Sequence, residues 1–127
     1  MNRLLLLLAL IQFTHLASAQ RRFNPEEMVQ REKEMVFKEV DNLSSMQTEL
    51  LKGIYDEFAV TMTETFEEIR ATRNWKEMRP RMRALQEDKD LLIKDVLNAS
   101  QFNKYAELTD YEARREARQN NKEGSPE

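Results

Sequence analysis

The chain of 127 residues contains no cysteine, one histidine, two glycines and three prolines. Without cysteine it cannot form the disulfides on which small exported domains often depend, so helix packing, self-association or both must stabilise it. Zinc sites use imidazole or thiolate ligands, and the one histidine, His15, lies in an N-terminal segment that we expect to be removed. We therefore expect no zinc site, and nothing in the sequence indicates a cofactor.

The sequence also lacks the alternation of β-branched and polar residues that is typical of strands. Its frequent residues, Glu, Lys, Arg, Leu, Ala, Met and Gln, are strong helix formers, and the composition therefore predicts an all-α fold. The formal net charge is −3. This mild acidity argues against a nucleic-acid-binding protein, because such proteins are usually strongly basic.

The first nineteen residues have the three parts of a secretory signal. Arg3 supplies a positive charge, residues 4–11 form a nearly unbroken apolar run, and Ala17–Ser18–Ala19 offers the small-x-small pattern that signal peptidase cleaves. The run is much shorter than the roughly 20 residues of a membrane-spanning helix. A buried N-terminal helix would need polar residues on one face, and Leu4–Leu8 has none. We predict a signal peptide at 1–19, cleavage after Ala19, and an exported chain without a membrane span.

Capping residues and apolar periodicity predict about four helices in the mature chain. A first helix over residues 25–41 begins at Asn24, which can cap it, and at the proline that follows. A capping box begins the second helix, with Ser44 as the cap, Gln47 three residues later and Leu43 just outside. This second helix carries apolar residues at three- and four-residue steps as far as about residue 70.

Another long amphipathic helix follows a short break at residues 71–73. Asn74 begins it with a further capping pattern, and Lys89 interrupts its apolar stripe. Pro80 should kink this helix or delay its regular part, because proline removes one backbone hydrogen bond. A short connection between two long amphipathic helices predicts an antiparallel helical hairpin.

A third capping pattern begins the last predicted helix. Asn98 is the cap, Gln101 stands at the box position, and Leu97 lies just outside, where it can pack against the first turns. The segment 108–112 is expected within this helix. Residues 119–127 lack apolar side chains, and we predict that they are disordered. The predicted helical domain is therefore 20–118.

The pentapeptides LSSMQ and LNASQ, at 43–47 and 97–101, share the pattern Leu–cap–x–x–Gln and bracket the predicted hairpin. In an exported, methionine-rich chain without cysteine, this arrangement resembles the Spy/CpxP family of bacterial periplasmic proteins, which carries two LTxxQ repeats. Ser44 and Asn98 stand where the family has threonine, and both residue types can cap a helix. The likeness covers roughly residues 25–117.

The resemblance implies a thin, curved, cradle-like homodimer in the periplasm that binds unfolded clients without ATP. It also implies an alternative, an adaptor that docks on an envelope-stress sensor kinase and inhibits it. A structural coiled-coil protein is a third interpretation, which Gly53, Pro80 and Lys89 disfavour because they interrupt the heptads. Independently of the resemblance, each helix has more apolar surface than its neighbours can cover, so a second copy or a client must cover some of it.

The first candidate binding surface is the end of the hairpin, where positive charge is unusual for an acidic protein. Methionine adapts to many shapes, and arginine stems can cover apolar surface, which suits a binder of diverse, partly unfolded clients. In the alternative interpretation this is a solvated turn, and Trp75 and Met82 belong to the hairpin core. The candidate residues are Arg70, Arg73, Trp75, Met78, Arg79, Arg81 and Met82.

The second candidate surface is a soft, aromatic-rich face of the second helix, formed by Met46, Phe58, Met62 and Phe66. A stripe of this kind is more often packed core, and we keep that alternative. Carboxylates also recur on the charged helices, and we interpret them as solvated faces: Glu67, Glu68, Asp88, Asp90 and Glu112. Without a mature histidine, a cysteine nucleophile or a phosphate-binding loop, we expect neither an enzyme nor a metal site.

Overall fold

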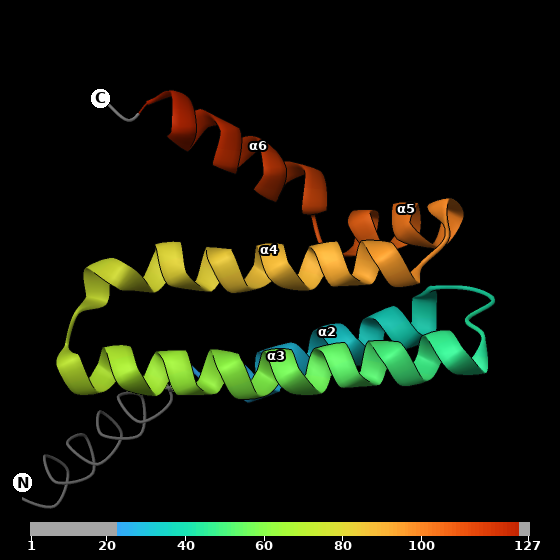
Figure 1. The fold of residues 1–127 in the computed structure, drawn as a ribbon, viewed down its shortest axis with the longest axis horizontal. Coiled ribbons are helices and arrows are strands. Elements are labelled where there is room, and N and C mark those ends of the chain that lie inside the picture. Colours follow the sequence, from blue (N-terminus) through green and yellow to red (C-terminus); the bar gives the residue numbers. More distant parts are fainter. Residues whose placement is uncertain (1–22, 125–127) are drawn as a thin grey trace, which may run out of the picture.

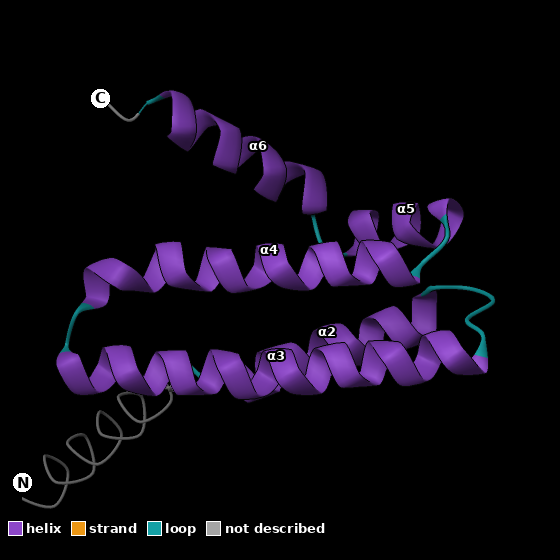
Figure 2. Ribbon diagram, viewed as in Figure 1, coloured by secondary structure: helices purple, strands orange, loops and turns teal. Residues whose placement is uncertain are grey.

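The computed structural model describes residues 23–124, except for the side chains of residues 118, 121 and 123. This part of the chain is helical and contains no strand (Figure 2), which confirms the predicted all-α class. Its elements are α2 (Pro25–Glu39), α3 (Ser45–Thr72), the short 3₁₀-helix η1 (Trp75–Glu77), α4 (Met78–Val96), α5 (Ala99–Leu108) and α6 (Tyr111–Glu123). None of these helices combines the length and the apolar character needed to cross a bilayer. The signal peptide predicted at 1–19 lies outside the described residues.

Helices α3 and α4 run antiparallel and side by side, and α2 packs along α3 (Figure 1). Helix α5 follows α4 and contacts α2, while α6 leads away from α4. Because the apolar faces of α2, α3 and α4 meet together with α5, the buried side chains form one core. Its fully buried members include Val36, Leu51, Tyr55, Ile93 and Tyr105.

Three helices begin at the predicted caps. The side chain of Asn24 accepts a hydrogen bond from the backbone N–H of Glu27 at 3.3 Å. Complete capping boxes begin α3 and α5. In each box the cap side chain accepts from the backbone N–H of the glutamine, and the glutamine side chain accepts from the backbone N–H of the cap. These bonds satisfy amides that a helix start otherwise leaves without partners.

The connection between α3 and α4 differs from the prediction. Helix α3 continues through Thr72, so the break is limited to Arg73, which has a left-handed φ of 54°, and Asn74. Asn74 makes no side-chain capping hydrogen bond, and the predicted cap there is wrong. The 3₁₀-helix η1 leads into α4 instead. Pro80 is the third residue of α4, where its missing N–H costs little, and the regular helix is delayed as predicted.

The single last helix predicted after Asn98 is two helices. Helix α5 ends at Leu108, and Asp110 adopts a left-handed φ of 52° before α6 begins. A left-handed residue cannot continue a right-handed helix, so segment 108–112 spans a break instead of lying within one helix. Helix α6 continues through Glu123, so residues 119–123 are helical where disorder was expected. Residues 125–127 lie outside the described part of the chain.

Candidate functional site

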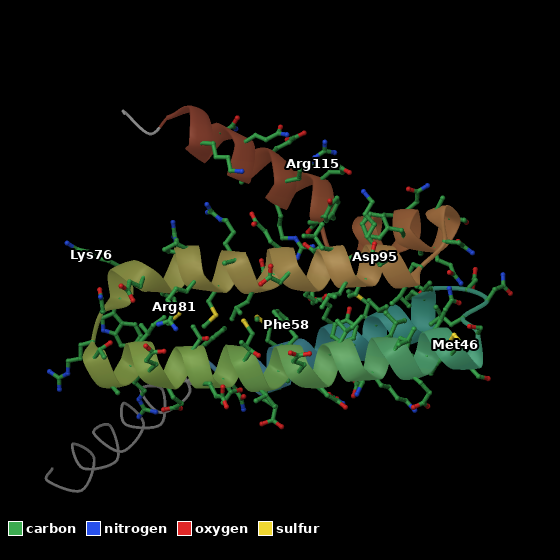
Figure 3. The ribbon with its side chains drawn as sticks, viewed as in Figure 1. Met46, Phe58, Lys76, Arg81, Asp95 and Arg115 are labelled. Atoms are coloured by element: carbon green, nitrogen blue, oxygen red, sulfur yellow. The ribbon has the colours of Figure 1, made fainter. Side chains whose placement is uncertain are left out.

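The predicted binding residues around the α3–α4 connection gather at one end of the molecule, near Lys76 and Arg81 in Figure 3. We call this region, residues 70–83, the arginine end. Its side chains Arg70, Arg73, Trp75 and Arg79 are exposed. The remaining predicted members, Met78, Arg81 and Met82, are half-buried.

The arginines of this region differ in their ion pairs. A guanidinium nitrogen of Arg81 lies 2.8 Å from a carboxylate oxygen of Glu68, and this hydrogen bond raises the pKa of Arg81 and lowers that of Glu68. Arg70 lies 3.8 Å from Glu67. No ion pair with a described residue is formed by Arg73, Arg79 or Arg83. Arg81 also lies 3.9 Å from Glu77, which precedes α4. The first turn of α4 itself contains no acidic residue, so Arg79 stands at the positive pole of this helix dipole without a neutralising neighbour in that turn.

Beside these arginines lies a recess of about 500 Å³ with both aromatic and polar side chains in its lining, which we call the Trp75 recess. It lies where the start of α2 meets the end of α3, and Phe23, Phe66, Arg70 and Trp75 contribute to its wall. The rings of Phe23 and Phe66 are 5.3 Å apart between centroids. Trp75 is 54% exposed, so the interpretation of Trp75 as core is wrong. Met82 is half-buried against the core, in agreement with the core interpretation.

The second predicted surface is divided between core and solvent. Phe58 and Met62 are buried, and Figure 3 shows Phe58 between α3 and α4, so the core interpretation holds for these two residues. Met46, near the other end of α3, is 74% exposed. Phe66 is half-buried and belongs to the Trp75 recess. The predicted groove is therefore not one continuous surface.

Several large apolar side chains remain exposed on the described surface. Leu50 of α3 and Leu92 of α4 are each about half exposed. Leu92 lines a shallow groove of about 150 Å³ between α3 and α4, together with Ile54 and Leu85. The other exposed large apolar residues are Phe23, Met28, Met46, Val60, Trp75 and Leu91. The fold thus leaves apolar area uncovered at several separate places.

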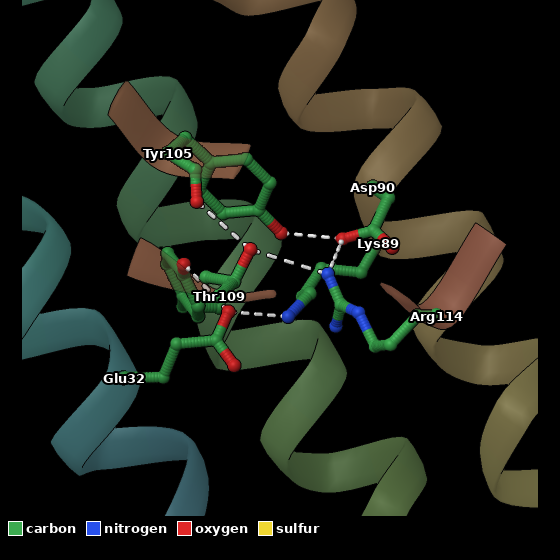
Figure 4. Close-up of polar contacts among 7 residues, drawn as sticks. Glu32, Lys89, Asp90, Tyr105, Thr109 and Arg114 are labelled. Carbon is green, nitrogen blue, oxygen red and sulfur yellow. Dashed lines mark hydrogen bonds and ion pairs between the residues drawn. The ribbon is translucent and has the colours of Figure 1, made fainter. Parts of the chain in front are cut away.

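A cluster of buried charges lies among residues of α2, α4, α5 and α6 (Figure 4), and Lys89 is its first member. Lys89 is 2% exposed, and its ammonium group forms an ion pair with Glu32 of α2. It also lies 4.8 Å from the ring centroid of Phe58. The hydroxyl of Tyr55 donates a hydrogen bond to the Glu32 carboxylate at 3.0 Å. Burial lowers the pKa of Lys89, and the carboxylate of Glu32 opposes this shift.

Asp90 is the second buried charge and is also 2% exposed. Its carboxylate accepts hydrogen bonds from the hydroxyl of Tyr105 and, at 3.1 Å, from a guanidinium nitrogen of Arg114. The same nitrogen of Arg114 donates to the hydroxyl of Thr109 at 3.2 Å. Burial raises the pKa of Tyr105, as it does that of Tyr55. We call Glu32, Lys89, Asp90, Tyr105 and Arg114 the buried charge cluster, and it joins α2, α4, α5 and α6.

This cluster was not predicted from the sequence. The interpretations of Lys89 as an interruption of the apolar stripe and of Asp90 as a solvated carboxylate are both wrong, because both side chains are buried. A signal was present for Lys89, because it lies four residues after Leu85 and four before Ile93, in the register of the buried face. A lysine at a core position needs an opposite charge from another helix, and the sequence alone does not show which helix supplies it.

The two pentapeptides meet in space. The amide nitrogen of Gln47 donates to the side-chain oxygen of Gln101 at 2.8 Å, and to the backbone carbonyl of Val96 at 3.1 Å. Gln101 donates to the backbone carbonyls of Asp41 at 3.2 Å and Asn42 at 3.1 Å. Each glutamine therefore closes its own capping box and also ties together chain segments that are distant in the sequence.

The described residues contain no group of three histidine, cysteine or acidic side chains close enough to hold a metal ion. No family model, curated protein or solved structure matches the chain.

Proposed function

We propose that this protein is a periplasmic, ATP-independent holdase chaperone that binds unfolded or misfolded envelope proteins at its arginine end. The observation that carries the proposal is the Trp75 recess, where Trp75 and Phe23 are about half exposed. Exposed aromatic surface of this kind favours contact with the apolar segments of an unfolded chain. The neighbouring Arg73 has no ion pair with a described residue and can speed encounter with acidic segments.

The remaining exposed side chains support weak binding at several points. Met46, Leu50 and Leu92 lie away from the Trp75 recess and offer further apolar contacts. A second copy of the chain that covered part of this surface would form the curved, cradle-like homodimer that the sequence resemblance implies. Such binding requires neither a nucleotide nor a chemical step, and the predicted signal peptide would deliver the chain to the periplasm.

An aggregation assay tests the proposal. The purified protein is added to several unrelated denatured proteins at near-stoichiometric ratios without nucleotide, and light scattering is followed. We expect it to suppress aggregation of most of them. Trp75→Ala should weaken suppression, whereas Gln30→Ala, at an exposed polar position on α2 outside the Trp75 recess, is the control. Unchanged suppression by Trp75→Ala would exclude this recess, and no suppression by the unaltered protein would refute the proposal.

An adaptor that inhibits an envelope-stress sensor kinase is the second candidate. The observation that favours it is the positive charge of Arg73, Arg79 and Arg83, which no described residue neutralises and which would complement an acidic receptor domain. An adaptor should bind one receptor domain tightly and protect no denatured protein. The aggregation assay therefore distinguishes the two candidates directly.

A further inference from the structure

A second recess, distinct from the Trp75 recess, lies between α4 and α6, where α6 diverges from α4 (Figure 1). Its volume is about 250 Å³. We call it the α4–α6 recess. The described residues that line it are Arg79, Met82, Arg83, Gln86, Arg114 and Ala117.

The charge of this recess is of one sign. Three of its six lining residues are arginines, and none of the six is acidic. Arg114 is held by Asp90 of the buried charge cluster, whereas Arg79 and Arg83 form no ion pair with a described residue. Arg79 and Arg83 are four residues apart on α4, so their like charges face each other and destabilise the helix slightly. A bound carboxylate would relieve this repulsion.

The rest of the lining determines what kind of anion fits. Met82 is half-buried, and its flexible side chain lines the recess together with Ala117 and the arginines, whose alkyl stems can cover apolar surface. Planar guanidinium groups match carboxylates in geometry. The volume is smaller than the roughly 300–1,000 Å³ of typical small-molecule pockets. These properties favour a peptide segment with a carboxylate beside an apolar side chain over a free small ligand.

We propose that the α4–α6 recess selects client segments in which acidic residues alternate with apolar ones. The client carboxylates would pair with Arg79 and Arg83, and an apolar side chain would contact Met82 and Ala117. This inference rests on the proposed holdase function and specifies the chemistry of the preferred client.

The test measures binding of labelled peptides to the purified protein by fluorescence anisotropy. One peptide alternates glutamate with leucine, a second alternates lysine with leucine, and a third alternates glutamate with serine. We expect the glutamate–leucine peptide to bind most tightly. The double variant Arg79→Glu/Arg83→Glu should bind it roughly tenfold more weakly. The control Lys38→Glu/Lys52→Glu changes the net charge equally at exposed positions outside the α4–α6 recess and should change affinity less than about twofold.

A second variant changes the recess from the side of α6. Ala117→Glu places a negative charge in the recess from an exposed position on α6, and it should weaken binding of the glutamate–leucine peptide without changing helical content. Equal losses in the recess variant and the lysine control would overturn the inference, as would equal affinity for the glutamate–leucine and lysine–leucine peptides. Concentration-dependent self-association lost only in Arg79→Glu/Arg83→Glu, without peptide binding, would assign the recess to a second copy and also overturn it.

The failure of this inference can be told apart from the failure of the proposed function. If the protein suppresses aggregation of denatured proteins but does not prefer the glutamate–leucine peptide, only the assignment of the recess is wrong. If it suppresses no aggregation, the holdase proposal itself is wrong.

Discussion

The buried charge cluster and the arginine end place the same kinds of side chain in opposite environments. In the cluster, Lys89 and Asp90 are each 2% exposed and are paired with Glu32 and Arg114. At the arginine end, an exposed arginine such as Arg79 has no ion pair with a described residue. A charge can be buried only with a partner, whereas an exposed charge can remain unpaired in water. We infer that the first set of charges holds the helices together and the second is free to bind.

Removal of a buried charge should lower the free energy of unfolding more than any other change considered. Asp90→Ala leaves Arg114 and the hydroxyl of Tyr105 without their shared acceptor, and should lower the free energy of unfolding by about 3–5 kcal/mol. Urea unfolding followed by circular dichroism measures this. Asp88→Ala, at an exposed position on the same helix, should cost less than about 0.5 kcal/mol. Similar losses for the two variants would show that burial does not set the role of these charges.

The paired glutamines Gln47 and Gln101 should differ in how much each contributes to stability. Gln101→Ala removes a capping bond and also the donor to the carbonyls of Asp41 and Asn42, so it should cost about 2 kcal/mol. Gln47→Ala removes a capping bond and the donor to one backbone carbonyl, that of Val96, so it should cost less, about 1 kcal/mol. The midpoints of urea unfolding give the order of the two variants. A larger loss for Gln47→Ala would contradict the account.

Alkaline pH tests the buried hydroxyl of Tyr55. Burial raises the pKa of Tyr55 above its ordinary value, so the folded protein keeps a proton that the unfolded chain loses. This stabilisation is complete below about pH 10 and is lost as the pH rises further, by about 1.4 kcal/mol per pH unit. Lys89 acts in the opposite sense, because its lowered pKa adds stability as the pH rises toward about 10.4.

Comparison with Tyr55→Phe isolates the contribution of the Tyr55 hydroxyl to the pH dependence of stability. The difference in unfolding free energy between the unaltered protein and this variant should shrink as the pH rises above about 10. Urea unfolding at a series of alkaline pH values measures it. A difference that does not change with pH would mean that Tyr55 loses its proton as readily in the folded protein as in the unfolded chain.

A substitution at the arginine end should change stability least. Trp75→Ala should change the free energy of unfolding by less than about 0.5 kcal/mol, because Trp75 is 54% exposed. Thermal unfolding followed by circular dichroism measures this. A large loss of stability would show that Trp75 helps to maintain the fold. The arginine end and the buried charge cluster would then not differ in their roles.

Much of the fold was predictable, because its signals are local. The caps at Asn24, Ser44 and Asn98 and the apolar periodicity of α3 depend on residues within one or two turns. The break at Asp110 was missed, because a non-glycine residue with positive φ has only a weak sequence signal. The cap expected at Asn74 failed, because a 3₁₀ turn begins there instead.

The candidate site was predictable in composition but not in arrangement. The run of arginines is visible in the sequence. The sequence does not show that Arg81 pairs with Glu68 while Arg79 forms no ion pair with a described residue. It placed Phe58 and Phe66 on one surface, and packing buries only Phe58. The ion pair between Lys89 and Glu32 joins α4 to α2 and depends on tertiary contacts that periodicity does not encode.

We infer that the arginine end binds clients and that the ion pairs of the buried charge cluster maintain the fold. Amide hydrogen exchange of the protein with and without a denatured client tests it most directly. We predict slower exchange on client addition across residues 70–83 and unchanged exchange across residues 98–109. Protection confined to residues 98–109, with no change at the arginine end, would contradict the account.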